Sequence, residues 1–130
     1  MTLKYHTRRD YMKIIGKNPI TGLDYPDPDV IRVDDTYYMV STTMHFVPGC
    51  EILRSYDLVH WEHLSYVYER LDSTEEQRLV GEKNCYGKGM WAASLRYHKG
   101  MYYIALWRMI PEKHTFILLI ISKDHGKNAS

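Results

Sequence analysis

Three carboxylates are gathered in a short proline-containing stretch near the N-terminus of the chain. Asp24, Asp27 and Asp29 occur in the sequence Asp-Tyr-Pro-Asp-Pro-Asp, which an apolar and aromatic run at residues 30–40 follows directly. The two prolines fix their own φ angles and push the residues before them, Asp27 included, toward extended conformations. A carboxylate held on a stiff turn just ahead of a strand is a candidate catalytic base.

A structural interpretation of these carboxylates competes with the catalytic one. An aspartate beside a proline commonly binds its own backbone in a turn and has no further role. For Asp24 and Asp29 we expect supporting or solvent-facing roles. The elements around the stretch must decide whether Asp27 differs from them.

The charge of the chain limits the partners that it could bind. In 130 residues, 17 Lys and Arg balance 16 Asp and Glu, giving a formal charge of +1. This composition lacks the basic surface that attracts nucleic acids or anionic membranes, so we expect neither as a partner. A neutral or small polar ligand fits better, and the oligomeric state stays open.

Metal sites and disulfides are not indicated. Cys50 and Cys85 are separated by 35 residues without a Cys-x-x-Cys spacing, and we expect two free, partly buried thiols. Residues with the spacing of metal ligands are not found, so the sequence itself predicts no cofactor.

The sequence shows no signal for membrane insertion or secretion. The apolar run at residues 116–121 is shorter than the roughly 18 residues of a membrane span. The charged N-terminus lacks the apolar region of a secretory signal, so the chain is expected to be cytoplasmic, while secretion of a longer parent protein stays open. Residues 1–16 are assigned to an N-terminal extension, in which Met12 would itself be a sensible start.

The chain contains an internal repeat with a period near 65 residues. Its landmarks are Arg32 with Arg96, Tyr37-Tyr38 with Tyr102-Tyr103, and Ser55-Tyr56-Asp57 with Ser122-Lys123-Asp124. The three landmarks recur in the same order, with offsets of 64, 65 and 67 residues. In each tyrosine pair, one side chain should face the core and the other should face outward.

Each repeat unit reads as a set of antiparallel strands. The first unit, about residues 26–69, has four β-rich runs, at residues 30–33, 36–42, 50–55 and 60–68. The second unit, about residues 90–124, has three, at residues 91–97, 101–109 and 115–122. Tight turns are expected at Asp34-Asp35 and Lys99-Gly100, and the polar residues of about 70–89 should form a loop.

Repeated four-stranded sheets are typical of β-propeller blades, because one such sheet has two faces and cannot bury both alone. We therefore predict an all-β fold in which residues 17–130 form two blades of an incomplete propeller ring. The second blade would lack its fourth strand, so its apolar residues 117–121 and its strand edge would be exposed. The chain then reads as the N-terminal part of a longer protein.

Several motifs, in this order along the chain, resemble the start of family 43 glycoside hydrolases. They are Asn18-Pro19-Ile20, Tyr25-Pro26-Asp27-Pro28, Ser41-Thr42-Thr43-Met44-His45, Ser55-Tyr56-Asp57-Leu58 and Gly89-Met90-Trp91-Ala92. The resemblance covers about residues 17–124. It implies the first two blades of a five-bladed β-propeller, and an inverting enzyme that hydrolyses the O-glycosidic bonds of xylo- or arabino-oligosaccharides.

The resemblance implies that Asp27 matches the general base of the family. An inverting hydrolysis also needs a carboxylic acid roughly 6.5–9.5 Å from the base. In the family that acid, a Glu, and the Asp that tunes its pKa belong to later blades, beyond Ser130. We therefore expect the chain on its own to be inactive as a hydrolase, and calcium enters only as a possibility that the resemblance brings.

The resemblance also implies substrate-binding residues. Trp91 matches the Trp of a Trp-Ala-Pro segment that lines the sugar site, with Ala93 in place of the proline, and an indole face can stack on a pentose. His45 and Phe46 fall in a loop where the family places wall residues of the site. Plain packing roles stay open for Trp91 and His45.

Two other functions stay open beside the enzyme. The chain could be a non-catalytic carbohydrate-binding or pseudo-enzyme remnant, since it carries one matched carboxylate, or a propeller that only makes protein contacts. The sequence does not distinguish xylose from arabinose, nor exo from endo action.

Overall fold

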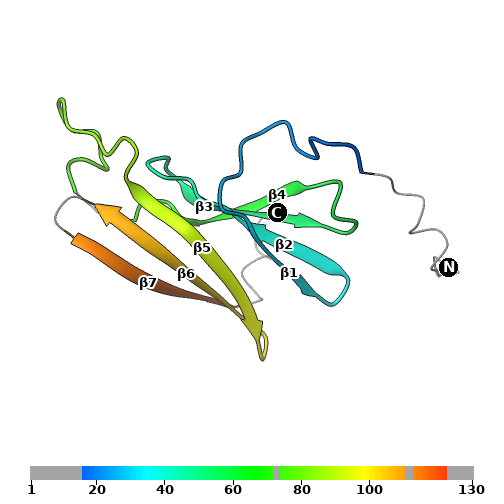
Figure 1. The fold of residues 1–130 in the computed structure, drawn as a ribbon. Helices are drawn as coiled ribbons and strands as arrows, with labels where there is room; N and C mark the ends of the chain where they lie inside the picture. The colour runs from blue at the N-terminus through cyan, green and yellow to red at the C-terminus, as the bar shows by residue number, and fades with distance from the viewer. Residues whose placement is uncertain (1–15, 72–73, 111–112, 123–130) are drawn as a thin grey trace, which may run out of the picture.

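The structure is a computed structural model that describes residues 16–71, 74–110 and 113–122. In these ranges the chain forms two antiparallel sheets and no helix, so no helix there could cross a membrane (Figure 1). The strands are β1 (Asp29–Val33), β2 (Thr36–Val40), β3 (Gly49–Ser55), β4 (Glu62–Tyr68), β5 (Gly89–His98), β6 (Met101–Ile110) and β7 (Lys113–Ser122). The expected N-terminal extension lies almost wholly outside the described residues.

The first sheet has the order β1–β2–β3–β4, and its strands fall where the sequence predicted them. β2 ends at Val40 instead of residue 42, because the next two residues turn to the Pro26 carbonyl oxygen. That oxygen accepts the Ser41 hydroxyl at 2.6 Å and the Thr42 backbone N–H at 3.0 Å. The strand is therefore cut short by the segment that carries the candidate base.

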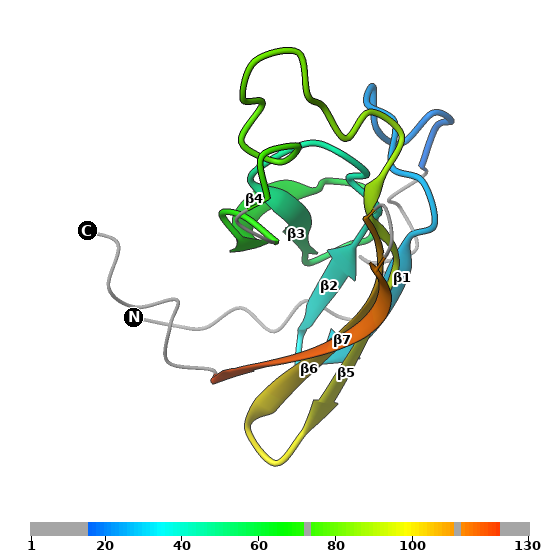
Figure 2. The same ribbon diagram turned by 90° about the vertical axis from the view of Figure 1, so that its left-hand side faces the viewer.

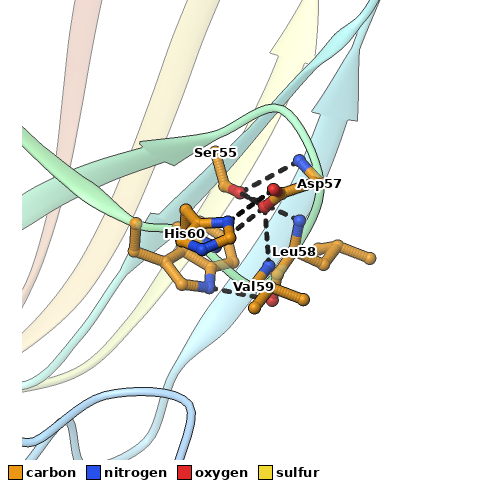
Figure 3. Close-up of polar contacts among 6 residues, drawn as sticks. Ser55, Asp57, Leu58, Val59 and His60 are labelled. Carbon is orange, nitrogen blue, oxygen red and sulfur yellow. Dashed lines mark hydrogen bonds and ion pairs between the residues drawn. The ribbon is translucent and has the colours of Figure 1, made fainter. Parts of the chain in front are cut away.

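β4 begins at Glu62 instead of residue 60 because Asp57 holds the preceding residues in a turn (Figure 3). One oxygen of its carboxylate, Oδ1, accepts the backbone N–H groups of Val59 and His60 at 2.9 and 2.8 Å. The other, Oδ2, lies 2.7 Å from Nδ1 of His60. The Ser-Tyr-Asp-Leu motif therefore forms the turn between β3 and β4.

The second sheet has the order β5–β6–β7, and its first hairpin repeats that of the first sheet. Both hairpins have two-residue turns, Asp34–Asp35 and Lys99–Gly100, which are 65 residues apart. Measured from these turns, the tyrosine pairs occupy equivalent positions. The arginines do not, because Arg32 pairs with Tyr37 whereas Arg96 pairs with Tyr103, the second tyrosine of its pair. The third landmark of the repeat extends outside the described residues.

The core lies between the two sheets. Its buried residues are Val40, Cys50, Met90, Ala93, Leu95, Ile104 and Leu106. Tyr38 and Tyr102, one from each pair, pack against this core with ring centroids 5.3 Å apart in an edge-on contact. Each tyrosine pair therefore contributes one inward ring, as the alternation predicts. Cys50 and Cys85 are free thiols, as predicted; Cys50 is fully buried and Cys85 is 3% exposed, so both are more buried than expected.

β7 presents its apolar residues on both faces. Ile117, Leu119 and Ile121 pack against the core, whereas Phe116, Leu118 and Ile120 are 56–61% exposed. The prediction that residues 117–121 are exposed as a block is therefore wrong, because the pleat sends alternate side chains to opposite faces.

Candidate active site

The segments that carry the predicted site residues lie at one end of the two sheets. Figures 1 and 2 show the segment before β1 and the loop before β5 at this same end. In an antiparallel sheet the start of β1 adjoins the end of β2, as the pairing of Asp29 with Val40 requires. This topology gathers the proline stretch, the loop after β2 and the start of β5.

Asp27 is exposed and adopts an unusual backbone conformation. Its φ is +47°, in the left-handed region, so the expectation of an extended residue is wrong. Aspartate tolerates this region better than most residues, and the hydrogen bonds of Ser41 and Thr42 to the preceding carbonyl hold the turn. A residue strained in this way and held by its surroundings is typical of functional sites.

Thr42 connects Asp27 to the second sheet. Its hydroxyl donates to Oδ2 of Asp27 at 2.9 Å, and Oγ1 accepts the backbone N–H of Ala92 at 2.8 Å. Thr42 is 4% exposed, so the threonine side of both bonds is buried although Asp27 itself is exposed. The carboxylate is thereby two hydrogen bonds from the residue that follows Trp91.

A β-bulge in β5 sets the position of Trp91. The register shifts by one residue between Trp91 and Ser94, and Ala92 within the bulge has a φ of +47°. A bulge turns backbone groups away from the ladder, which frees the Ala92 N–H for Thr42. The Trp91 indole is half-buried, and its Nε1 is buried with no acceptor among the described residues. What the side chain exposes is therefore ring surface, as stacking on a sugar requires.

The loop after β2 is joined to the start of β5 by a pair of backbone hydrogen bonds. The backbone N–H of Met44 donates to the carbonyl oxygen of Met90, and the N–H of Met90 donates to that of Met44, each at 3.1 Å. The approach is so close that a Cβ on Gly89 would lie 2.1 Å from the Met44 carbonyl oxygen, and Gly89 has a φ of +102°. This bridge places the two residues that follow Met44 beside the Trp91 segment.

His45 and Phe46 form a stack of rings with Tyr86, from the loop before β5. The centroid of His45 lies 4.4 Å from that of Phe46 and 4.7 Å from that of Tyr86. Nδ1 of His45 accepts the backbone N–H of Gly87 at 3.1 Å, which leaves the proton of the neutral ring on Nε2. Phe46 is 64% and Tyr86 79% exposed, so aromatic faces remain open to a ligand.

Two hollows lie beside this stack. One, of about 510 Å³, is lined by His45, Leu79, Asn84, Cys85 and Tyr86. The other, of about 400 Å³, has the carboxylates of Asp24 and Glu51 with the rings of Tyr25, Phe46 and Tyr66 on its walls, and also includes Thr42. His45 and Tyr86 thus line the first hollow, and Phe46 lines the second.

Asp29 binds protein groups and is a structural residue. Its Oδ2 accepts the Leu95 N–H at 2.8 Å, the Ser94 hydroxyl at 3.0 Å and the Arg96 guanidinium at 2.7 Å. Burial raises the pKa of Asp29, but these hydrogen bonds outweigh it and hold the pKa below its usual value. Of the two expected roles, the supporting one fits Asp29, and Asp24 lines a hollow as an exposed carboxylate.

Two residues of this region were missed in the sequence. Thr42 was part of a recognised motif, but its role depends on contacts with residues 15 and 50 positions away. Tyr86 lies in the polar loop predicted at about residues 70–89, where an aromatic residue between Cys85 and Gly87 is the available signal. Within the described ranges, no group of three or more His, Cys, Asp or Glu side chains is placed to hold a metal ion.

Comparison with known proteins links this arrangement to one family. The family model of glycosyl hydrolases family 43 matches residues 16–125. A β-xylosidase of Formosa agariphila is 42% identical over 86 residues, which are 66% of this chain and 14% of that protein. A non-reducing end α-L-arabinofuranosidase of Bacteroides ovatus is 39% identical over 89 residues, 68% of this chain and 16% of that protein. The chain thus spans about a seventh of the length of these relatives.

Solved structures give the same result. A bifunctional family 43 protein of Bacteroides eggerthii superposes with a TM-score of 0.75 at 41% identity, over 88% of this chain and 14% of that one. A xylan β-1,4-xylosidase of Bacillus halodurans superposes with a TM-score of 0.61 at 28% identity, over 82% of this chain and 20% of that one. The predicted fold, two blades of a five-bladed propeller with an incomplete ring, is confirmed. The roles of Asp27, Trp91, His45 and Phe46 stay predictions. The chain itself belongs to glycosyl hydrolases family 43.

Proposed function

We propose that these two blades belong to an inverting glycoside hydrolase that acts on xylo- or arabino-oligosaccharides, with Asp27 as its general base. The observation that supports this most is the setting of Asp27. Asp27 is exposed, and its strained backbone follows the Pro26 carbonyl, which accepts the Ser41 hydroxyl and the Thr42 backbone N–H. The Thr42 hydroxyl binds the Asp27 carboxylate and connects it to the segment of Trp91. The names of the relatives, a β-xylosidase and an α-L-arabinofuranosidase, support the two sugar classes.

In the proposed reaction, Asp27 takes a proton from a water molecule. The water oxygen forms a bond to the anomeric carbon on the face opposite the leaving group, while the glycosidic bond breaks and the leaving oxygen receives a proton from a separate carboxylic acid. Only the first half of this chemistry has its residue here. By the pattern of the family, a Glu in a later blade supplies the acid.

The aromatic side chains would bind the sugar. The half-buried ring of Trp91 can stack on the apolar face of a pentose and leave its hydroxyls for polar partners. His45 carries an Nε2 proton that can be donated to a hydroxyl, and the exposed faces of Phe46 and Tyr86 flank it. Trp91, His45 and Phe46 are accordingly assigned to substrate binding.

The base is tested by Asp27→Asn in the enzyme that contains these blades. We expect turnover of nitrophenyl xyloside or arabinofuranoside to fall by at least about 10³-fold with sugar binding retained, because the amide cannot accept the proton of water. Asp35→Asn is the matched control, since Asp35 lies in the β1–β2 turn with a side chain 99% exposed. Normal turnover by the Asp27→Asn enzyme would refute the assignment. Proton NMR of the first-formed sugar anomer tests inversion.

We further propose that the 130-residue chain has no hydrolase activity of its own. One carboxylate cannot act both as base and as acid in a single inverting displacement. Purified chain should therefore release no xylose or arabinose from nitrophenyl glycosides, and measurable release would contradict this.

A second candidate function is carbohydrate binding without catalysis. It is favoured by the stack of His45, Phe46 and Tyr86, because all three residues come from this chain and need no acid to hold a sugar. Calorimetry of the chain with xylobiose distinguishes the candidates. Binding without any activity in a longer protein would favour the binding role, whereas activity that depends on Asp27 would favour the enzyme.

A further inference from the structure

We propose that Thr42 is the positioning residue of the catalytic base. Its hydroxyl donates to the carboxylate of Asp27 and orients it. The same hydroxyl oxygen accepts the Ala92 N–H, and so links the charged carboxylate to the β5 bulge beside Trp91. The inference rests on the proposed role of Asp27 as general base.

The directions of the two hydrogen bonds follow from the chemistry of the groups. The backbone N–H of Ala92 can only donate, so Oγ1 of Thr42 accepts at 2.8 Å. An ionised carboxylate can only accept, so the single hydroxyl proton of Thr42 goes to Oδ2 of Asp27 at 2.9 Å. The order is therefore Ala92 to Thr42 to Asp27. A hydroxyl that accepts one hydrogen bond while donating another is polarised and becomes a better donor.

Thr42 is itself held in place. Its backbone N–H donates to the Pro26 carbonyl at 3.0 Å, and the neighbouring Ser41 hydroxyl donates to the same oxygen at 2.6 Å. The β-branched side chain has restricted χ1 freedom, and only 4% of the residue is exposed. Both the peptide before Asp27 and the carboxylate of Asp27 are thus bound by one buried pair of residues.

The two residues that Thr42 connects are both strained. Asp27 and Ala92 each have a φ of +47°, a conformation uncommon in residues other than glycine. Such conformations persist where the surrounding structure holds them. Among the described residues, Thr42 is the donor that holds the Asp27 side chain, whereas Asp29 accepts three donors from one stretch of β5. Asp27 is therefore left accessible to water while its orientation stays fixed.

An NMR titration of the 130-residue chain tests the connection without any need for activity. The chemical shift of the Ala92 amide should change with pH in the same titration step as the chemical shift of the Asp27 carboxyl carbon. The step at Ala92 should be lost in Thr42→Val, which keeps the shape but lacks the hydroxyl, and should be kept in Thr42→Ser. The amide of Leu95, which binds Asp29, is the internal control and should keep its own step in all three proteins.

The proposal would be overturned if the Ala92 amide shift did not change with the titration of Asp27 in the wild-type chain. It would also be overturned if that change persisted in Thr42→Val. If Thr42→Val does not fold, the comparison of wild type with Asp27→Asn decides, because the step at Ala92 must be present in the first and absent in the second. Absence of any hydrolysis by a longer protein would count against the proposed function and leave this test intact.

Kinetics of the enzyme that contains these blades test the positioning itself. Thr42→Val should lower kcat by roughly 10- to 100-fold and change KM by less than about twofold, since a misdirected base affects the transition state more than sugar binding. Thr42→Ser should restore kcat to within about threefold of wild type, because the hydroxyl is the working group. Equal losses in Val and Ser variants, or a loss confined to KM, would show that Thr42 only fills space.

Discussion

The carboxylate of Asp29, at the start of β1, accepts the backbone N–H of Leu95 in β5 at 2.8 Å. The bond joins the first strands of the two sheets, just beyond the bulge in β5. A backbone donor that is not used in its own ladder needs a partner, and a side chain of the other blade supplies it. The side chains of Ser94 and Arg96 donate to the same oxygen, so the contact is also a junction between the blades.

Asp29→Ala should destabilise the chain by about 2–3 kcal/mol, because it leaves a buried N–H and two further donors without their acceptor. Asp29→Asn should cost less, since its side-chain oxygen can still accept. Urea unfolding followed by tryptophan fluorescence measures both. The control is Asp35→Ala, whose side chain is 99% exposed and makes one ion pair at 3.6 Å. A loss in Asp29→Ala no larger than in this control would contradict the junction.

The same carboxylate should make stability depend on pH. The hydrogen bonds from Leu95, Arg96 and Ser94 overcome the effect of burial, so the pKa of Asp29 in the folded chain is lowered from 3.8. A lowered folded pKa contributes stability that is present above the unfolded pKa and is lost as pH falls through the folded one. The free energy of unfolding should therefore fall between about pH 5 and pH 2 less steeply in Asp29→Ala than in wild type.

The turn at Asp57 should be a second determinant of stability (Figure 3). The contact with the His60 ring, together with backbone N–H donors, holds the pKa of Asp57 well below its usual range. Asp57→Ala removes both carboxylate oxygens that accept these hydrogen bonds and should lower the free energy of unfolding in urea by about 1–2 kcal/mol. Asp57→Asn keeps one oxygen for the N–H groups of Val59 and His60 and should lose about half as much. Equal losses would mean that the charge, and not the turn geometry, carries the effect.

The strands and hairpins could be predicted because their signals are local. Alternation of inward and outward side chains marks β2 and β6, and two-residue turns follow from Asp34-Asp35 and Lys99-Gly100. Each tyrosine pair places one ring against the core, as predicted, but this ring is the second of its pair in β2 and the first in β6, as the contact of Tyr38 with Tyr102 shows.

The geometry around Asp27 could not be predicted in this way, because it depends on contacts between distant residues. Local rules for a residue before proline favour an extended Asp27, but Ser41 and Thr42, 15 residues from their partners, leave β2 and hold it in the left-handed region. The bulge at Ala92 has no local signal, since its N–H partner lies 50 residues earlier. Sequence patterns therefore identified the candidate base but not what orients it.

The two cysteines should be almost unreactive in the folded chain. Burial raises the pKa of Cys50 to about 12 and also raises that of Cys85. At pH 8 the Cys50 thiol is therefore ionised in about one molecule in 10,000, and the thiolate is the reactive form. Reaction of Cys50 with a disulfide reagent should thus be slower than in urea by at least about 100-fold, and Cys85 should be slowed in the same direction. Cys50→Ala and Cys85→Ala variants identify each signal, and we expect Cys85, in the loop before β5, to react first through local opening.

Gly89→Ala should disrupt the bridge that brings His45 and Phe46 to the start of β5. The new Cβ would lie 2.1 Å from the Met44 carbonyl oxygen, on a residue whose φ is +102°. Overlap with the backbone and the unfavourable φ together should cost about 3 kcal/mol or more. Because Met44 would have to move, the contacts of the His45 ring with its neighbours should be lost as well.

Two other glycines separate these causes. Gly100 has a φ of +81°, and no atom lies within 4 Å of a Cβ added there. Gly100→Ala should therefore show only the cost of placing an alanine at positive φ, about 1–2 kcal/mol. Gly22→Ala has neither feature and should be close to neutral. Urea unfolding gives the three free energies, and nuclear Overhauser contacts between the rings of His45 and Tyr86 report on the stack. If Gly89→Ala kept these contacts and cost no more than Gly100→Ala, the close approach of the Met44 loop to β5 would be wrong.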